Sequence, residues 1–300
     1  MRPPKKLQDL NLIDKFLFDE VMESLEVHEA MLRIILGDPG ITLVGESVTE
    51  RELRSLPSLK SVRLDVIARS NDNTVYNTEM QQQQRNDLAR RSRFYQSLID
   101  SRQLNAGTVN YNGLPDSYVI IIMPYDLFGL GKYVYHIDMT VREAGDMALG
   151  DGAHRIFLNT RGRNYDEISS ELRDFLHYVE KSNDETAGLS NSERLQKIND
   201  RVKAIRESDE SEERYLNSWE EKAIIKAEGR AEGIAEGIAE GMAKGKAEFI
   251  LEILGDAGEV PSGLYEEIIS EKDLKALDRW FKIAAKSSSV EEFISLYKLQ

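Results

Sequence analysis

Three polar residues stand out because they lie within otherwise strand-like stretches. Asp65 lies in the stretch 62–68, and Glu79 and Gln81 end the stretch 74–81. Both stretches run apolar or alternate apolar with polar residues, as strands do. The Asn-Asp-Asn triplet between them is typical of a turn. The sequence therefore predicts a β-hairpin that carries one carboxylate on each arm.

This hairpin favours metal chemistry. Glu79 and Gln81 are two residues apart, so a strand projects them from the same face. Carboxylates held close on adjacent strands repel each other unless a cation lies between them, and hard oxygen ligands suit Mg²⁺ or Mn²⁺. Such a cation lowers the pKa of bound water and polarises a phosphate, which is the chemistry of phosphodiester hydrolysis. Taken alone, strand carboxylates are more often solvated or paired with Lys or Arg.

Several segments in order make the pattern more specific. They are Asp14–Phe18, Arg63–Val66, Asn77–Gln81, Arg91–Tyr95 and a late Glu-Gly-Ile-Ala repeat. Together they resemble the PD-(D/E)XK nuclease superfamily in its Glu-x-Gln variant, and more narrowly its bacterial recombination-promoting nuclease and putative transposase group. The resemblance covers about residues 7–160 and, less closely, the repeat. It implies an α/β, restriction-endonuclease-like α-β-β-β-α-β core followed by an α-helical C-terminal region.

The resemblance also implies roles for individual residues. Asp65 and Glu79 become metal ligands, with the Met80 backbone carbonyl as a further oxygen, and Asp65, Glu79 and Gln81 form the catalytic set. The more familiar motif has Lys where Gln81 stands. A Gln amide orients water but brings no positive charge. That charge would then have to come from a nearby Arg or a second metal.

Two groups of supporting residues remain open. An acidic residue on the first predicted helix is expected to complete the metal shell, and the candidates are Asp14, Glu20 and Glu29. The helix after the hairpin offers phosphate-binding candidates, namely Arg91, Arg93 and Tyr95. Ordinary surface charge explains Arg91 equally well, and core packing is the more common role for a residue such as Tyr95.

The whole chain agrees with a cytoplasmic protein. Its 300 residues contain no cysteine, which excludes disulfides, thiolate zinc sites and cysteine nucleophiles. No apolar run reaches the roughly 18 residues of a membrane span, and residues 1–6 lack the apolar stretch of a signal peptide. The four histidines are scattered, and no Gly-rich phosphate loop is present. We therefore expect no membrane association and no small-molecule cofactor.

The charge distribution permits DNA as the partner. The net charge is −14, which by itself opposes nucleic-acid binding. Residues 1–160 hold 18 Lys and Arg against 22 Asp and Glu, whereas residues 161–300 hold 21 against 31. The segment 85–102 holds five Arg and two Asp. Most of the acidic excess therefore lies outside the nuclease-like half, and we expect weak DNA affinity without a metal ion.

Apolar spacing predicts the elements and four regions. Helices are expected over 12–36, 85–104 and 165–181, and further strands over 41–44, 117–123, 133–138 and 155–158. The regions are a nuclease-like domain over 1–163, a helical linker region over 164–221, a repeat helix over 222–254 and a small helical module over 255–300.

The repeat at 227–248 consists of Ala-Glu-Gly-x units with glycine at 229, 233, 237, 241 and 245. Each glycine costs a helix about 1 kcal/mol relative to Ala. Small residues four apart let another helix approach closely, and a four-residue period drifts about 40° per repeat around the axis. The repeat is thus interpreted either as a self-association helix, which gives a homo-oligomer, or as a marginal helical tether.

Three functions are weighed. The first is a metal-dependent DNA endonuclease of low sequence specificity, acting in recombination, mobile-element activity or phage defence. The second is a degenerate nuclease scaffold that binds DNA or protein, which Gln81 and the acidic balance favour. In the third, the acidic C-terminal half restrains the nuclease by mimicking DNA against residues 85–102.

Overall fold

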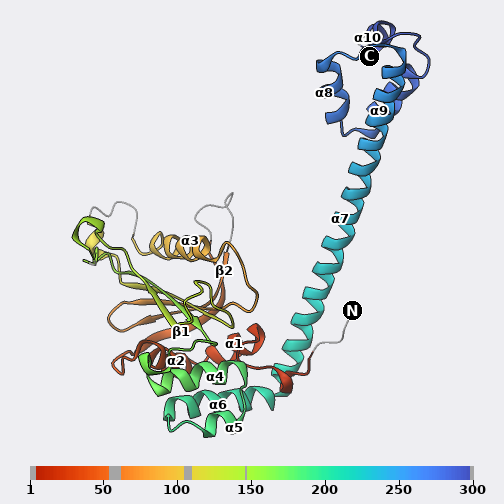
Figure 1. Cartoon of the computed structure of the whole chain (residues 1–300). Coiled ribbons are helices and arrows are strands. Elements are labelled where there is room, and N and C mark those ends of the chain that lie inside the picture. Colours follow the sequence, from red (N-terminus) through yellow and green to blue (C-terminus); the bar gives the residue numbers. More distant parts are fainter. Residues whose placement is uncertain (1–4, 54–61, 105–109, 146, 298–300) are drawn as a thin grey trace. The chain divides into compact units, whose positions relative to one another are not determined.

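The computed structural model describes residues 5–53, 62–104, 110–145 and 147–297. Residues 1–4, which belong to the N-terminal segment 1–6, lie outside the described residues. The chain divides into two compact units, Met1–Leu216 and Asn217–Gln300. Figure 1 shows the elements of both units.

The first unit is built on a six-stranded mixed sheet in the order β1-β2-β3-β4-β6-β5. The strands are β1 (Leu43–Leu53), β2 (Val62–Ser70), β3 (Val75–Met80), β4 (Ser117–Met123), β5 (Val134–Ile137) and β6 (Ala153–Asn159). β2 is antiparallel to both of its neighbours β1 and β3, whereas β3, β4 and β6 are parallel, and β5 is antiparallel to β6. The continuous apolar run of β4 suits its central, buried place.

The predicted hairpin is formed by β2 and β3. Its turn is closed by Ser70 N–H, which donates to Thr74 O over 2.9 Å. Asn73 adopts φ 76°, in the left-handed region that Asn tolerates better than most residues. The register pairs Val66 with Thr78. Because strand side chains alternate between faces, this register sends Asp65 and Glu79 to the same face of the sheet.

Helices cover both faces of the sheet (Figure 1). α3 (Leu88–Asp100) packs on the face that includes Val119 and Ile121, whereas α1 (Lys15–Met22) and α2 (Leu25–Leu36) pack on the other face. The predicted order α-β-β-β-α-β is therefore confirmed. One helix differs from the prediction. The helix expected over 12–36 is two helices, because Ser24 is extended with ψ 111°.

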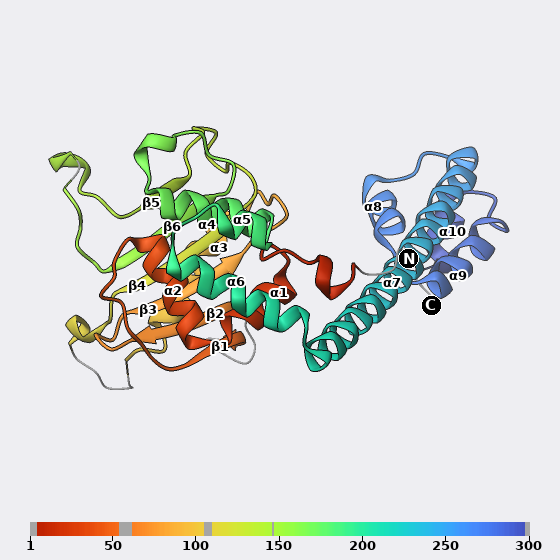
Figure 2. The same cartoon turned by 90° about the horizontal axis from the view of Figure 1, so that it is seen from below.

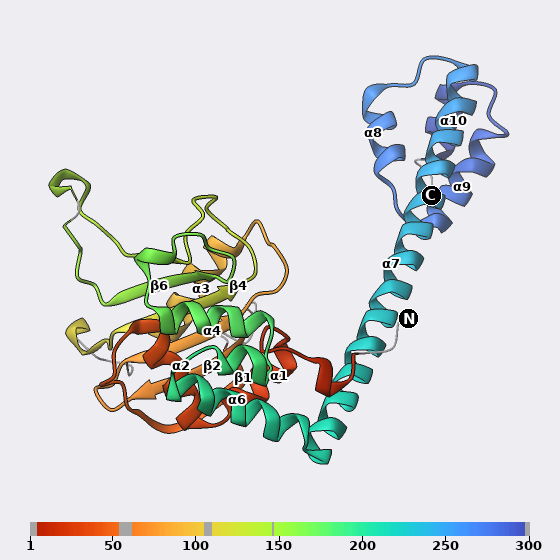
Figure 3. The ribbon, with the colours of Figure 1, turned by 60° about the horizontal axis from the view of Figure 1, so that its bottom comes forward.

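Three helices beyond the predicted nuclease-like domain complete the first unit. α4 (Ser170–Glu180) and α6 (Glu193–Arg206) share the core of α1 and α2, and the short α5 (Asp184–Gly188) joins them. Figures 2 and 3 show α4 and α6 beside α2. A hydrogen bond from Leu12 N to Ser182 Oγ, 2.8 Å long, joins the segment before α1 to the segment after α4. The core of this unit thus continues past residue 163.

The second unit contains most of α7 (Asp209–Ala257), which is one continuous helix, and then α8 (Ser262–Ser270), α9 (Leu274–Ala284) and α10 (Val290–Tyr297). These three helices gather around the last turns of α7 (Figure 2). Their common core includes Ala247, Ile250, Leu254, Leu277 and Phe293. Short 3₁₀ turns elsewhere are η1 (Leu7–Asp9), η2 (Tyr111–Gly113), η3 (Arg142–Ala144) and η4 (Tyr165–Glu167). Among the described residues, no helix is both long and apolar enough to cross a membrane.

Candidate functional site

Asp65 and Glu79 are joined where the hairpin opens. The regular pairing of β2 with β3 extends to Val66 opposite Thr78. Beyond that pair, Asp65 N–H donates to Glu79 Oε1 over 3.1 Å, and Met80 N–H donates to Asp65 Oδ2 over 3.0 Å. Each carboxylate therefore takes the place of a backbone acceptor on the opposite strand. Both side chains are held in fixed positions, and Asp65 and Glu79 are only 7% and 6% exposed.

Asp65 and Glu79 are so close together, and so deeply buried, that a negative charge on one opposes a negative charge on the other. Burial, together with the charge of the neighbouring Asp65, raises the pKa of Glu79 to about 8. Hydrogen bonds from Asp65 N–H and Asn77 Nδ2 act in the opposite direction but are outweighed. Without a bound cation, Glu79 therefore holds a proton through most of the neutral pH range. Such a shifted pKa is common where carboxylates perform chemistry.

Lys15 is a member of this cluster to which the sequence analysis gave no role. It lies in the first turn of α1, and its Nζ is 2.6 Å from Asp65 Oδ1 and 2.9 Å from Asp19 Oδ2. Although burial opposes the charged ammonium, the charges of Asp65 and Asp19 raise the pKa of Lys15. Lys15 is thus a permanent cation beside Asp65. Lys15 belongs to the N-terminal segment Asp14–Phe18 of the resemblance, but no short stretch of sequence indicates that this segment contacts β2.

A second cationic group approaches from α3. Arg91 Nη1 donates to Gln81 Oε1 over 3.2 Å, and its Nε donates to the Tyr95 hydroxyl over 3.1 Å. Its guanidinium carbon lies 5.3 Å from the centre of the Tyr95 ring. Burial raises the pKa of Tyr95 to about 12, and the charge of Glu79 contributes. Gln81, Arg91 and Tyr95 therefore form one network next to the carboxylates, whereas Arg93 is exposed.

The three supporting acids lie in different surroundings. Asp14 Oδ1 accepts from Gln82 Nε2 over 3.0 Å, so it lies beside the segment that follows Gln81. Glu20 pairs with Arg214 at the start of α7. Glu29 pairs with Arg33 over 2.8 Å and accepts from Leu43 N–H over 2.9 Å.

Among the described residues, no group of three or more His, Cys, Asp or Glu side chains is placed to hold a metal ion. The structure thus brings Asp14 near the candidate site, while the described contacts of Glu20 and Glu29 are made elsewhere. Asp65 and Glu79 alone still fit a hard divalent cation, since Mg²⁺ dehydrates reluctantly and keeps several waters when bound by one or two carboxylates. Lys15 already neutralises Asp65, so a cation there would share Asp65 with the ammonium.

Comparison with known proteins agrees with this architecture. Residues 40–227 match the family described as PD-(D/E)XK nuclease family transposase. The matched range begins before β1 and contains the hairpin, α3, the rest of the sheet and helices α4 to α6. No curated protein and no solved structure matches the chain. The match spans more than half of the sequence, and the chain therefore belongs to the PD-(D/E)XK nuclease family transposases.

Proposed function

We propose that this protein is a metal-dependent endonuclease that hydrolyses DNA phosphodiester bonds with low sequence specificity. The observation that carries the proposal is the buried, reciprocally hydrogen-bonded pair Asp65–Glu79 at the opening of the hairpin. Burying two carboxylates side by side is costly, and a structural role alone would be served by neutral side chains. The proposed cellular role is DNA recombination, mobile-element activity or phage defence.

The proposed cofactor is Mg²⁺ or Mn²⁺, held by Asp65, Glu79 and the Met80 carbonyl. When bound, such an ion supplies an activated water and neutralises charge on the phosphate. The donor set is made of hard oxygen atoms, which these ions prefer. The proton on metal-free Glu79 has to leave before both carboxylates can act as ligands, so metal binding is expected to weaken as the pH falls below about 8.

The remaining residues position water and DNA. The Gln81 amide is held by Arg91 and can orient a water molecule. The positive charge that Gln81 itself lacks is supplied by Arg91 on one side and Lys15 on the other. Both cations are fixed by hydrogen bonds before substrate arrives, and charge held in place in advance is the efficient way to stabilise a phosphoryl transition state. Arg93, exposed on the same helix as Arg91, is proposed to contact the DNA backbone.

Cleavage of supercoiled plasmid tests the proposal. Wild type, Asp65→Ala and Glu79→Ala are each incubated with Mg²⁺, Mn²⁺ or EDTA. We expect nicking by wild type that needs metal and is lost in both variants. Glu26→Ala is the matched control, because Glu26 is an exposed carboxylate of the same unit and its ion pair among the described residues is with Lys197. Nicking that survives both site variants would place the active site elsewhere.

A binding scaffold is the second candidate function. The ion pair of Lys15 with Asp65 favours it, since that ammonium satisfies Asp65 without any metal. Under this alternative, wild type cleaves nothing with either metal. A chain shortened after Leu216 then distinguishes a scaffold from a nuclease restrained by its C-terminal part. Leu216 is the appropriate end, because a cut near residue 163 would remove α4 and α6 from the core.

A further inference from the structure

One face of α7 is apolar and unusually symmetric in sequence. Its members are Ala227, Ala231, Ile234, Ile238, Met242, Gly245 and Phe249. Successive members are spaced by four, three, four, four, three and four residues, which keeps them within one stripe along the helix. The spacing reads the same in both directions from Ile238. We call this stripe the α7 seam.

The α7 seam is exposed within the second unit. Ile234, Ile238, Met242 and Phe249 are each more than half exposed, and every residue from 224 to 242 is classed as exposed. A helix draws most of its stability from tertiary packing, and five glycines cost this one about 1 kcal/mol each relative to Ala. Within the second unit, no other described segment covers residues 224–242 and offsets that cost. A partner that packs on the α7 seam would offset it.

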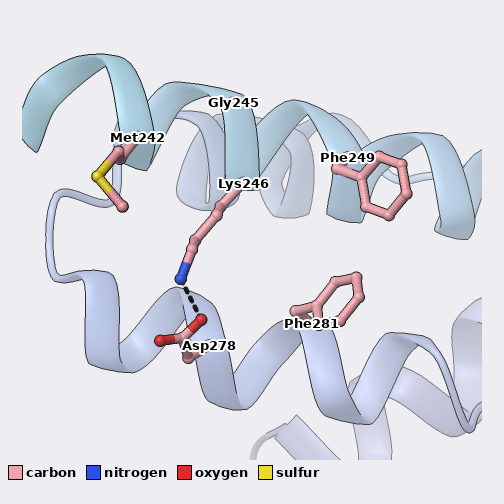
Figure 4. A pocket seen from close by; sticks show the side chains of 6 residues that line it. All are labelled: Met242, Gly245, Lys246, Phe249, Asp278 and Phe281. Carbon is pink, nitrogen blue, oxygen red and sulfur yellow. Dashed lines mark hydrogen bonds and ion pairs between the residues drawn. The ribbon is translucent and has the colours of Figure 1, made fainter. Parts of the chain in front are cut away.

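The C-terminal end of the α7 seam borders a groove of about 470 Å³ between α7 and α9 (Figure 4). Its lining residues are Met242, Gly245, Lys246, Phe249, Asp278 and Phe281. The rings of Phe249 and Phe281 are 5.8 Å apart. At Gly245 even an added Cβ would meet no atom within 4 Å. The floor of the groove is therefore open and apolar, and suits a helix face with small side chains.

The N-terminal part of the α7 seam is such a face, because Ala227 and Ala231 are its only side chains there. We propose that the groove receives the α7 seam of a second copy of this chain, in an antiparallel helix pair with its two-fold axis at Ile238. Ile238 then meets Ile238 of the partner, and Ile234 meets Met242. Ala231 lies over Gly245, and Ala227 lies over Phe249. A two-fold pair fills both grooves at once.

The charges beside the α7 seam support the antiparallel direction. Glu228 and Lys246 lie on one edge of it, and Arg230 and Glu248 lie on the other. In the antiparallel register, Glu228 faces Lys246 of the partner and Arg230 faces Glu248. Within one chain, Lys246 pairs with Asp278, so Glu228 would join that ion pair.

A parallel pair lacks this complementarity. Residues flanking a parallel seam face partner residues five positions away, which would set Glu228 beside Ala223 and Arg230 beside Ala235. It would also stack Phe249 on Phe249 and leave the alanine end without a groove. The antiparallel pair is thus favoured by both shape and charge, and it does not depend on nuclease activity.

The mass of the full-length protein in solution is the first test. Light scattering at micromolar concentration is expected to give twice the chain mass of 34.2 kDa. Ile238→Lys places two like charges at the axis, and its mass should fall to 34.2 kDa. Ile225→Lys is the matched control, since Ile225 is equally exposed but points away from the α7 seam. Wild type that stays monomeric, or an Ile225→Lys variant that dissociates as readily, overturns the proposal.

Disulfide trapping tests the direction, because the chain has no cysteine of its own. Ala231→Cys and Gly245→Cys are oxidised separately and as a mixture. The antiparallel pair predicts cross-linked dimer only in the mixture. Cross-linking of either variant by itself indicates a parallel pair and refutes the register, as does the absence of cross-linking in a dimeric mixture.

A charge exchange tests the edges of the α7 seam. Arg230→Glu and Glu248→Arg are each expected to weaken the dimer about tenfold, because the symmetric pair contains this contact twice. The double variant restores opposite charges and should regain wild-type affinity. If the double variant is no tighter than either single variant, these residues do not face each other.

Discussion

Lys15 and Asp65 are 50 positions apart in sequence, yet the ammonium of one lies 2.6 Å from a carboxylate oxygen of the other. This contact ties α1 to β2 at the point where the hairpin opens. Asp65 is thereby held from two sides, by Lys15 at Oδ1 and by the Met80 N–H at Oδ2. The positive charge that the Glu-x-Gln motif lacks is thus supplied by Lys15 of α1, which lies beside the motif in the folded chain.

Replacement of Lys15 distinguishes a cation that takes part in the reaction from one that only neutralises Asp65. If Lys15 supplies charge to the reaction, Lys15→Ala is expected to lower metal-dependent plasmid nicking about a hundredfold. Lys15→Arg, which keeps the charge, should retain much more activity. If Lys15 merely satisfies Asp65 in an inactive scaffold, Lys15→Ala instead binds Mn²⁺ more tightly and still cleaves nothing. Titration with Mn²⁺, followed by its paramagnetic effect on water relaxation, measures the second quantity independently of cleavage.

Arg91 and Arg93 form a natural comparison on α3. Arg91 is fixed by Gln81 and Tyr95, whereas Arg93 is exposed. Arg91→Gln should therefore lower the cleavage rate with DNA bound, because the charge is lost beside Gln81. Arg93→Gln should mainly weaken DNA binding and make it less dependent on salt. Single-turnover cleavage and salt-dependent binding separate the two effects, and equal losses from both variants would contradict this division.

The hairpin that carries Asp65 and Glu79 could be predicted because its signals are local. Alternating residues on both arms, a polar turn and the Asp65…Glu79-x-Gln81 spacing lie within about twenty residues. These signals depend only on the period of a strand and the chemistry of a turn. The same holds for β4, whose apolar run marks a central strand.

The role of Lys15 and the extent of the first unit could not be predicted in the same way. The contact of Lys15 with Asp65 depends on how α1 docks against the sheet, which no short window of sequence encodes. The helices α4 and α6 show ordinary amphipathic spacing, and spacing does not say which surface a helix covers. The break between α1 and α2 at Ser24 was also missed, because the apolar period continues through it.

His28 is a buried group whose described hydrogen bond is made outside the candidate site. It is completely buried in α2, and burial lowers its pKa to about 3. Its Nδ1 lies 2.9 Å from Ser47 Oγ, while no hydrogen bond within the described residues reaches its Nε2. The folded protein therefore keeps this imidazole neutral. In the unfolded chain, His28 regains an ordinary pKa of about 6.5.

This difference predicts an acid-sensitive fold. Below about pH 6.5 the unfolded chain binds a proton that the folded chain does not. The free energy of unfolding therefore decreases as the pH is lowered from about 6.5 to about 3. The loss is about 1.4 kcal/mol per pH unit for one such group. His28→Gln removes this titration. The free energy of unfolding of the variant, measured with urea, should therefore depend less steeply on pH between pH 6 and pH 4, by the equivalent of about one bound proton. His136→Gln, at an exposed histidine of the same unit, is the control. Equal pH slopes for wild type and His28→Gln would show that His28 titrates alike in the folded and unfolded chain.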